Sequence, residues 1–237
     1  MLPPIYITIL FLLLIGFVLF FTYKAVNYAA TQARYDPAKR KKLLLQLFGG
    51  VFLWMILTAG AAMSGFLTDF TARPPRLLLV LVGSFGVLLL LMTRPTFQAL
   101  VHYVPKHWII YSQAFRIPLE VVLWWLYLNE LIPIQMTFEG YNFDIISGVL
   151  AVGVGFYYQR YPKGKRILGV IWNILGASLV FTIVGIAAVS VPGPLRIFNN
   201  EPANRIIACF PYVWLPTLLV TYALLAHWAS LQQFLKR

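Results

Sequence analysis

The sequence predicts an all-α fold: a polytopic membrane protein, built as a bundle of seven transmembrane helices, with its N-terminus outside and its C-terminus in the cytoplasm. Hydrophobic residues make up 60% of the 237 residues, charged residues only 11%, and the mean hydropathy is +0.78. These values are typical of a chain that lies in a bilayer. We therefore expect a single transmembrane domain over residues 1–237, surrounded by membrane lipids.

The first apolar stretch, residues 5–23, is long enough to cross a bilayer and has no charged residue before it. It also lacks a small-residue cleavage site after a short apolar region, so we expect a retained helix and not a signal peptide. Six further spans follow along the chain. They cover residues 47–68, 77–92, 108–128, 143–158, 167–191 and 206–231.

The positive-inside rule gives the orientation of these spans. Most Lys and Arg residues fall in connections on one side, which we assign to the cytoplasm. The basic residues on the other side are Arg73, Arg76, Arg196 and Arg205. The segment QARYDPAKRKK, residues 32–42, is interpreted as an ordinary topogenic loop, with a short interfacial helix as the alternative. Asn-x-Ser/Thr acceptors are absent, which fits a bacterial inner (plasma) membrane.

Composition also limits the partners and cofactors of the protein. The net charge of +12 would favour nucleic-acid binding in a soluble protein, but the basic residues here lie in short loops, so we expect no nucleic-acid partner. Cys209 is the single cysteine, so neither an intrachain disulfide nor a thiolate metal cluster can form. The common hydrolase, metalloprotease, nucleotide-binding and redox motifs are absent. We expect no cofactor, and we favour a non-enzymatic function.

The fourth span, residues 108–128, differs from the others because it carries charge near its middle. On a helical wheel its polar side chains fall within an arc of roughly 80°, and the opposite arc is apolar. The members of this polar stripe are Gln113, Arg116, Glu120, Trp124 and Tyr127. Pro118 cannot donate to the carbonyl of Ala114 and should bend the helix.

Ionisable residues inside a membrane are costly and commonly mark a functional site. We predict that the fourth span binds a small, anionic solute, together with Asn173 of the sixth span. The predicted substrate-binding residues are Gln113, Arg116, Glu120, Tyr127 and Asn173. The leading hypothesis is therefore a transporter or permease-like protein. In the structural alternative, Arg116 and Glu120 are each other's partner, and the protein is a receptor or an assembly protein.

A second polar group lies in an outer loop, within the sequence EGYNFD. Glu139, Asn142 and Asp144 offer the oxygen ligands that a hard cation such as Ca²⁺ prefers, although no recognised ligand spacing is present. Two of these carboxylates could also act as general acid and base, which gives a third hypothesis: a membrane enzyme for a lipid-linked substrate. The simplest interpretation is that Asp144 caps the fifth helix.

Other features of the sequence predict local structure. Ser147, Ala151 and Gly155 form a stripe of small residues that favours close helix packing. Pro211 and Pro216 should break the outer part of the seventh span. Two His-Trp pairs, at residues 107–108 and 227–228, are interpreted as aromatic anchors at the cytoplasmic surface.

Overall fold

The computed structural model describes residues 3–235, and the regular elements within that range are all helical, with no strand. The long helices are α1 (Ile5–Gln32), α2 (Pro37–Met63), α3 (Arg76–Thr93) and α8 (Arg166–Ser190). The shorter ones are α4 (Pro95–Val101), α5 (Lys106–Ser112), α6 (Arg116–Leu128), α7 (Asp144–Arg160) and α9 (Val220–Leu235). The predicted all-α class is thus confirmed for the described residues.

Four of these helices, α1, α2, α3 and α8, are long and apolar enough to cross a membrane. Large apolar side chains are exposed along them, including Leu13, Ile56 and Phe181. A water-soluble surface rarely carries so many, so these helices support the membrane character of the chain. The count of seven spans and the orientation of the termini stay predictions.

The start of α2 differs from the sequence prediction. The loop is limited to residues 33–36: α1 continues to Gln32, and α2 begins at Pro37, ten residues before the predicted span. The physical reason is a strong start signal, because the Asp36 carboxylate accepts a hydrogen bond from the Lys39 N–H at 2.8 Å and Pro37 occupies the first turn. The basic residues 39–42 therefore lie on the first turns of a long helix.

The predicted fourth span is divided by a turn of 3-10 helix. Helix α5 ends at Ser112, a 3-10 turn covers Gln113–Phe115, and α6 begins at Arg116. Because Pro118 has no N–H to donate, the α-helical bond to the Ala114 carbonyl is missing, and the interruption falls at the place where the sequence predicts it.

The predicted seventh span, residues 206–231, is also interrupted. A 3-10 turn at Ile206–Ala208 is followed by non-helical turns, and a π-helix at Leu215–Leu219 leads into α9. Pro211 and Pro216 remove two backbone donors from this stretch, so a regular α-helix starts only at Val220.

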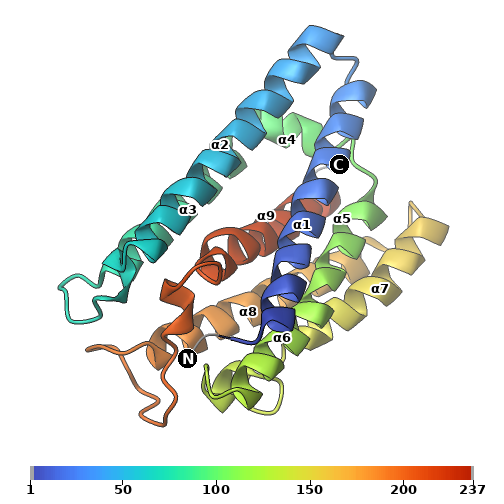
Figure 1. Ribbon diagram of the computed structural model, residues 1–237. Helices are drawn as coiled ribbons and strands as arrows, with labels where there is room; N and C mark the ends of the chain where they lie inside the picture. The colour runs from blue at the N-terminus through green and yellow to red at the C-terminus, as the bar shows by residue number, and fades with distance from the viewer. Residues whose placement is uncertain (1–2, 236–237) are drawn as a thin grey trace.

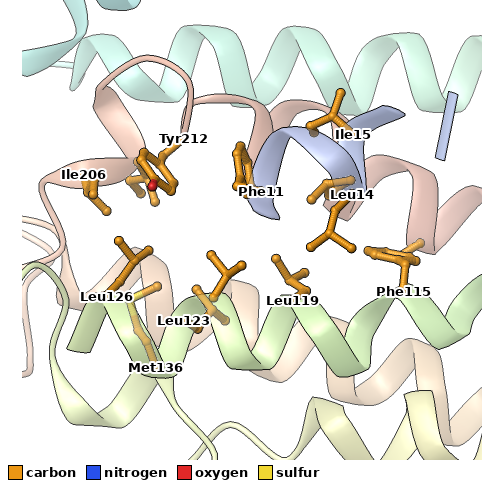
Figure 2. Close-up of a cluster of buried hydrophobic side chains, with 14 of the residues drawn as sticks. Phe11, Leu14, Ile15, Phe115, Leu119, Leu123, Leu126, Met136, Ile206 and Tyr212 are labelled. Atoms are coloured by element: carbon orange, nitrogen blue, oxygen red, sulfur yellow. The ribbon is translucent and has the colours of Figure 1, made fainter. Parts of the chain in front are cut away.

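Figure 1 shows α2 and α3 as a hairpin at one side of the molecule, where α3 contacts α9. Helices α5, α7, α8 and α9 pack on one another, and α1 contacts α6. The main hydrophobic cluster lies between α1, α6 and the chain before α9, where Phe11 stacks on Tyr212 with ring centroids 4.9 Å apart (Figure 2). In Figure 2, Leu119 and Leu123 of α6 face this cluster. Since α1 covers its apolar face, α6 turns its polar face toward α7 and α8.

Candidate functional site

Helix α6 carries two buried charges near the centre of the molecule. Arg116 and Glu120 are each 1% exposed and lie one turn apart. The salt bridge of Arg116 is made with Asp144, whose Oδ1 lies 3.1 Å from the Nη1 nitrogen. This corrects the expected pairing of Arg116 with Glu120. The reason is tertiary, because α7 begins opposite α6 and brings a carboxylate that is 28 residues away in sequence.

In the described structure, a single nitrogen of Arg116 makes all the hydrogen bonds of the side chain. Besides Asp144, the Nη1 group donates to the Ser147 hydroxyl at 2.6 Å and to the Gly176 carbonyl at 3.3 Å. The Nε and Nη2 atoms are buried and have no protein partner among the described residues. These two atoms form the side edge of the guanidinium, where two parallel N–H groups suit the two oxygens of a carboxylate.

Glu120 is held on one oxygen and left without a partner on the other. Asn142 donates from Nδ2 to Glu120 Oε1 at 2.7 Å and to the Met136 carbonyl at 3.1 Å. The Asn142 Oδ1 atom accepts from the Asp144 N–H at 3.1 Å. Glu120 Oε2 is buried without a protein partner among the described residues. Asn142 thus fixes Glu120 and the start of α7 in one arrangement.

Asp144 does not cap α7 as expected. Phe143 is the N-cap residue, and Asp144 is the first residue of the helix, with its carboxylate turned to Arg116. A carboxylate in the first turn of a helix is stabilised by the helix dipole. The start of α7 therefore places a negative charge against the Arg116 side chain, in a region where α6, α7 and α8 meet.

A cavity of about 110 Å³ borders these charges. Arg116, Glu120 and Asp144 line one part of it, and the remainder of its lining is apolar. Most of the apolar residues come from α3, α6, α8 and the broken start of α9. They include Leu81, Phe85, Leu119, Val180, Val184, Ala187, Leu215, Pro216 and Leu219. The site is thus a hydrophobic pocket with one charged end.

Gly176 is a point of close approach between α8 and its neighbours. A Cβ atom at this position would overlap the imidazole of His227 and the hydroxyl oxygen of Ser147. Only glycine leaves room for these two side chains and brings its own carbonyl within reach of Arg116.

His227 is not the surface anchor that the sequence predicts. It is 2% exposed, its Nδ1 lies 3.0 Å from Asn173 Oδ1, and its ring packs on Trp172 with centroids 4.9 Å apart. Asn173 also donates to Ser230 Oγ at 2.9 Å. Since an amide oxygen only accepts, Nδ1 carries the proton and Nε2 is the acceptor. The adjacent Trp228 stacks on Phe97, so His227 and Trp228 have different roles.

The remaining predicted binding residues lie outside the cavity. Gln113 is fully buried and donates to the Ala223 carbonyl at 3.0 Å, and Tyr127 packs against the main hydrophobic cluster. Asn173 belongs to the His227 group on the other side of Gly176. The structure thus brings Arg116 and Glu120 to the pocket and places Gln113, Tyr127 and Asn173 around it. Their role in binding a solute stays a prediction.

Of the three weak candidates for a cation site, Asn142 and Asp144 are in contact within the buried group, whereas Glu139 is not part of that group. Asn142 and Asp144 are buried and bonded to Glu120 and Arg116. Glu139 is exposed, and it accepts a hydrogen bond from Trp124 Nε1 at 2.9 Å. Within residues 3–235, no three Asp, Glu, His or Cys side chains gather in an arrangement that could hold a metal ion.

The loops at residues 69–75 and 192–205 hold further charged groups, and these are partly or fully exposed. Hydrogen bonds from Thr71, through its hydroxyl and its N–H, lower the pKa of Asp69, which also forms a salt bridge of 3.0 Å with Arg76. A hydrogen bond from the Ala203 N–H and one from Arg196 lower the pKa of Glu201. These groups are ordinary surface pairs, in contrast to the buried set around Arg116.

A second cavity, of about 630 Å³, lies between α1, α2, α4, α5 and α9. It is larger, but Arg94 is the one charged residue in its lining, and that side chain is exposed. The smaller cavity combines buried charge with polar atoms that lack partners, and we take it as the candidate site.

Sequence reasoning missed three contributors to this site: Ser147, Gly176 and His227. The sequence indicates Ser147 only as one member of a stripe of small residues, and that stripe does contact the fourth span, since Gly155 lies against the Tyr111 ring. The Ser147 hydroxyl could have indicated this role, because a polar member of a small-residue stripe can donate or accept a hydrogen bond with a charged group on the opposing helix.

Comparisons with protein-family models, with curated proteins and with solved structures found no match for this chain. Any functional assignment therefore depends on the geometry of the buried charges and of the pocket beside them.

Proposed function

We propose that this chain is a transporter or permease-like membrane protein, with an intramembrane pocket for a small anionic solute. The observation that carries the proposal is the unpaired side edge of Arg116, at Nε and Nη2, in a side chain that borders the pocket and is 1% exposed. Two buried donors without partners are costly, and a bound carboxylate or phosphate oxygen pair would satisfy both at once.

The start of α9 supports a transport role. Leu215, Pro216 and Leu219 belong to the π-helix that precedes α9, and all three line the pocket. Interrupted helices beside a binding site near the middle of the membrane are typical of transporters, because the irregular segment can move against the rest of the bundle. The same break would let the pocket open and close.

A structural role for Arg116 is the second candidate. The Arg116–Asp144 salt bridge joins α6 to α7 and is buried, with side-chain exposures of 1% and 8%. In a receptor or an assembly protein, this bridge would fix the register of two helices and bind no solute.

The enzyme hypothesis needs outer carboxylates that exchange protons with a lipid-linked substrate. Asp144 is bonded to Arg116, and Glu139 is bonded to Trp124 and does not join Asp144, so we do not propose an enzyme.

The proposal includes the seven-span arrangement in a bacterial inner membrane, with the N-terminus outside. This orientation places Cys209 at the outer end of the seventh span and Lys163 in the cytoplasm, and both residues are exposed. We expect a membrane-impermeant maleimide to label the native cysteine on intact cells. A Cys209→Ser, Lys163→Cys variant should be labelled only after the cells are permeabilised. The reverse pattern would overturn the orientation.

Substitution of Arg116 tests the binding role. We expect the purified protein, in lipid nanodiscs, to bind at least one anion from a panel of acetate, butyrate, hexanoate, benzoate and methyl phosphate. Arg116→Lys keeps the charge but loses the paired edge, so it should weaken binding about tenfold or more, which corresponds to the loss of one charge-assisted hydrogen bond. Isothermal titration calorimetry measures the affinity, and uptake into proteoliposomes measures transport.

The matched control is Arg160→Gln, which removes an exposed arginine far from the pocket lining. Its affinity and uptake should equal those of the wild type. If the wild type binds no anion in the panel, the proposal is wrong. Binding without uptake would leave the pocket as a receptor site and would refute the transport role.

A further inference from the structure

We infer that the solute is a small carboxylate with an apolar group, and that the pocket binds it together with one proton on Glu120. This inference deepens the proposed function and rests on it. Three features of the pocket lead to it: its charge balance, its unpaired polar atoms, and the composition of its lining.

The charge balance is unfavourable for an anion on its own. The ionisable residues in the lining are Arg116 and Glu120 from α6 and Asp144 from α7. The lining residues from α3, α8 and α9 are apolar. His227 of α9 is outside the lining and packs against Gly176, whose carbonyl accepts a hydrogen bond from Arg116. With both carboxylates ionised, one cation already faces two anions. An anionic solute would add a third negative charge, which would be repelled strongly in a buried site unless a proton neutralises one carboxylate.

Glu120 is the carboxylate that can accept this proton. Asp144 is bonded to Arg116 at 3.1 Å, so its negative charge is already balanced. Glu120 Oε1 is held by Asn142, whereas Oε2 is buried and has no protein partner among the described residues. A proton on Oε2 would turn this oxygen into a donor, and the solute carboxylate is an acceptor that the donor could reach within the same pocket.

The unpaired atoms then match a carboxylate completely. Its two oxygens accept from Arg116 Nε and Nη2, and the protonated Glu120 donates to one of them as well. The proton comes from water on the side where the solute enters, and it leaves Glu120 when the solute leaves. No covalent bond of the solute forms or breaks, and the solute anion and the proton together carry no net charge.

The lining limits the rest of the solute to an apolar group. Beyond the three charged residues, the described part of the pocket offers no polar side chain, so the hydroxyl groups of a sugar or a polyol would lose their hydrogen bonds to water without replacement. The size is also limiting. An apolar protein cavity of roughly 150 Å³ accepts benzene, and this pocket is smaller, at about 110 Å³. The volume therefore limits the apolar group to a short alkyl chain or, as the upper limit, a single ring.

Calorimetry of benzoate binding tests the inference directly. Titrations in two buffers that differ in ionisation enthalpy report the number of protons taken up for each benzoate bound. We expect about one proton, and an affinity that falls about tenfold for each pH unit above the value at which free Glu120 ionises. Benzamide, the uncharged amide of benzoic acid, should not bind measurably.

Glu120→Gln provides the decisive variant, because glutamine keeps a neutral donor in place of the protonated acid. This variant should bind benzoate with no proton uptake and with an affinity that does not change with pH. The matched control is Glu139→Gln, an exposed glutamate that is bonded to Trp124 and absent from the lining, and it should behave as the wild type does.

Ala187→Phe tests the apolar end of the pocket. Ala187 lies in the lining, and a phenyl ring there would occupy the space of the solute's apolar group. Benzoate affinity should fall at least tenfold, while acetate affinity should change less than twofold.

The outcomes separate the two proposals. If benzoate and the other anions fail to bind to the wild type, the proposed function itself is wrong. If benzoate binds without proton uptake, and Glu120→Gln leaves its pH dependence unchanged, only the role of Glu120 is refuted. If gluconate, a polar carboxylate, binds as tightly as benzoate, the apolar character of the solute is refuted.

Discussion

Replacing Arg116 by alanine is expected to lower the free energy of unfolding by about 3–5 kcal/mol. The reason is the charge left behind: Asp144 keeps a carboxylate whose side chain is 8% exposed, and the substitution removes its salt-bridge partner. A buried charge without a partner costs far more than the loss of a surface contact. Reversible unfolding in mixed micelles, followed by circular dichroism, measures the difference.

Two comparisons make this expectation specific. The double substitution Arg116→Met with Asp144→Leu removes both charges, and it should recover most of the lost stability while anion binding stays absent. Arg76→Ala removes an arginine from a partly exposed pair with Asp69, so it should change the stability by less than about 1 kcal/mol. An Arg116→Ala variant as stable as Arg76→Ala would show that the buried bridge is not maintained in the folded protein.

Gly176→Val is expected to have the second large effect. The new side chain would overlap the His227 ring and the Ser147 hydroxyl, which must then move. Such overpacking costs about 1–3 kcal/mol, and a shift of Ser147 also removes the 2.6 Å hydrogen bond that positions Arg116. We therefore expect lower thermal stability and weaker benzoate binding in the same variant.

Gly185→Val is the matched control for this prediction. Gly185 lies on the same helix α8, and a Cβ atom there would have open space within 4 Å. The control should keep the wild-type unfolding temperature and benzoate affinity. If both valine variants behave alike, the effect belongs to valine in this helix and not to the contact among α7, α8 and α9.

The local features of the fourth span can be predicted from its sequence. Helical periodicity places Arg116 and Glu120 on one face, and the missing N–H of Pro118 predicts the interruption that the structure has at Gln113–Phe115. The break before α9 is predicted in the same way by Pro211 and Pro216. These predictions succeed because they depend on a few adjacent residues. The loop predicted over residues 32–42 is wrong, because Asp36 with Pro37 is a stronger helix start than the basic composition of the segment indicates.

Three properties can be derived from the amino-acid sequence alone: the chain is helical, its surface is apolar enough for a membrane, and the charged stripe of the fourth span is turned inward. The groups that meet this stripe depend on the tertiary structure. Asp144 pairs with Arg116, Asn142 holds Glu120, and Gly176 admits His227. The physical reason is that periodicity fixes the face on which a side chain lies, whereas its partner depends on how helices distant in sequence pack. That packing leaves two nitrogens of Arg116 and one oxygen of Glu120 without partners among the described residues, at the edge of an apolar pocket.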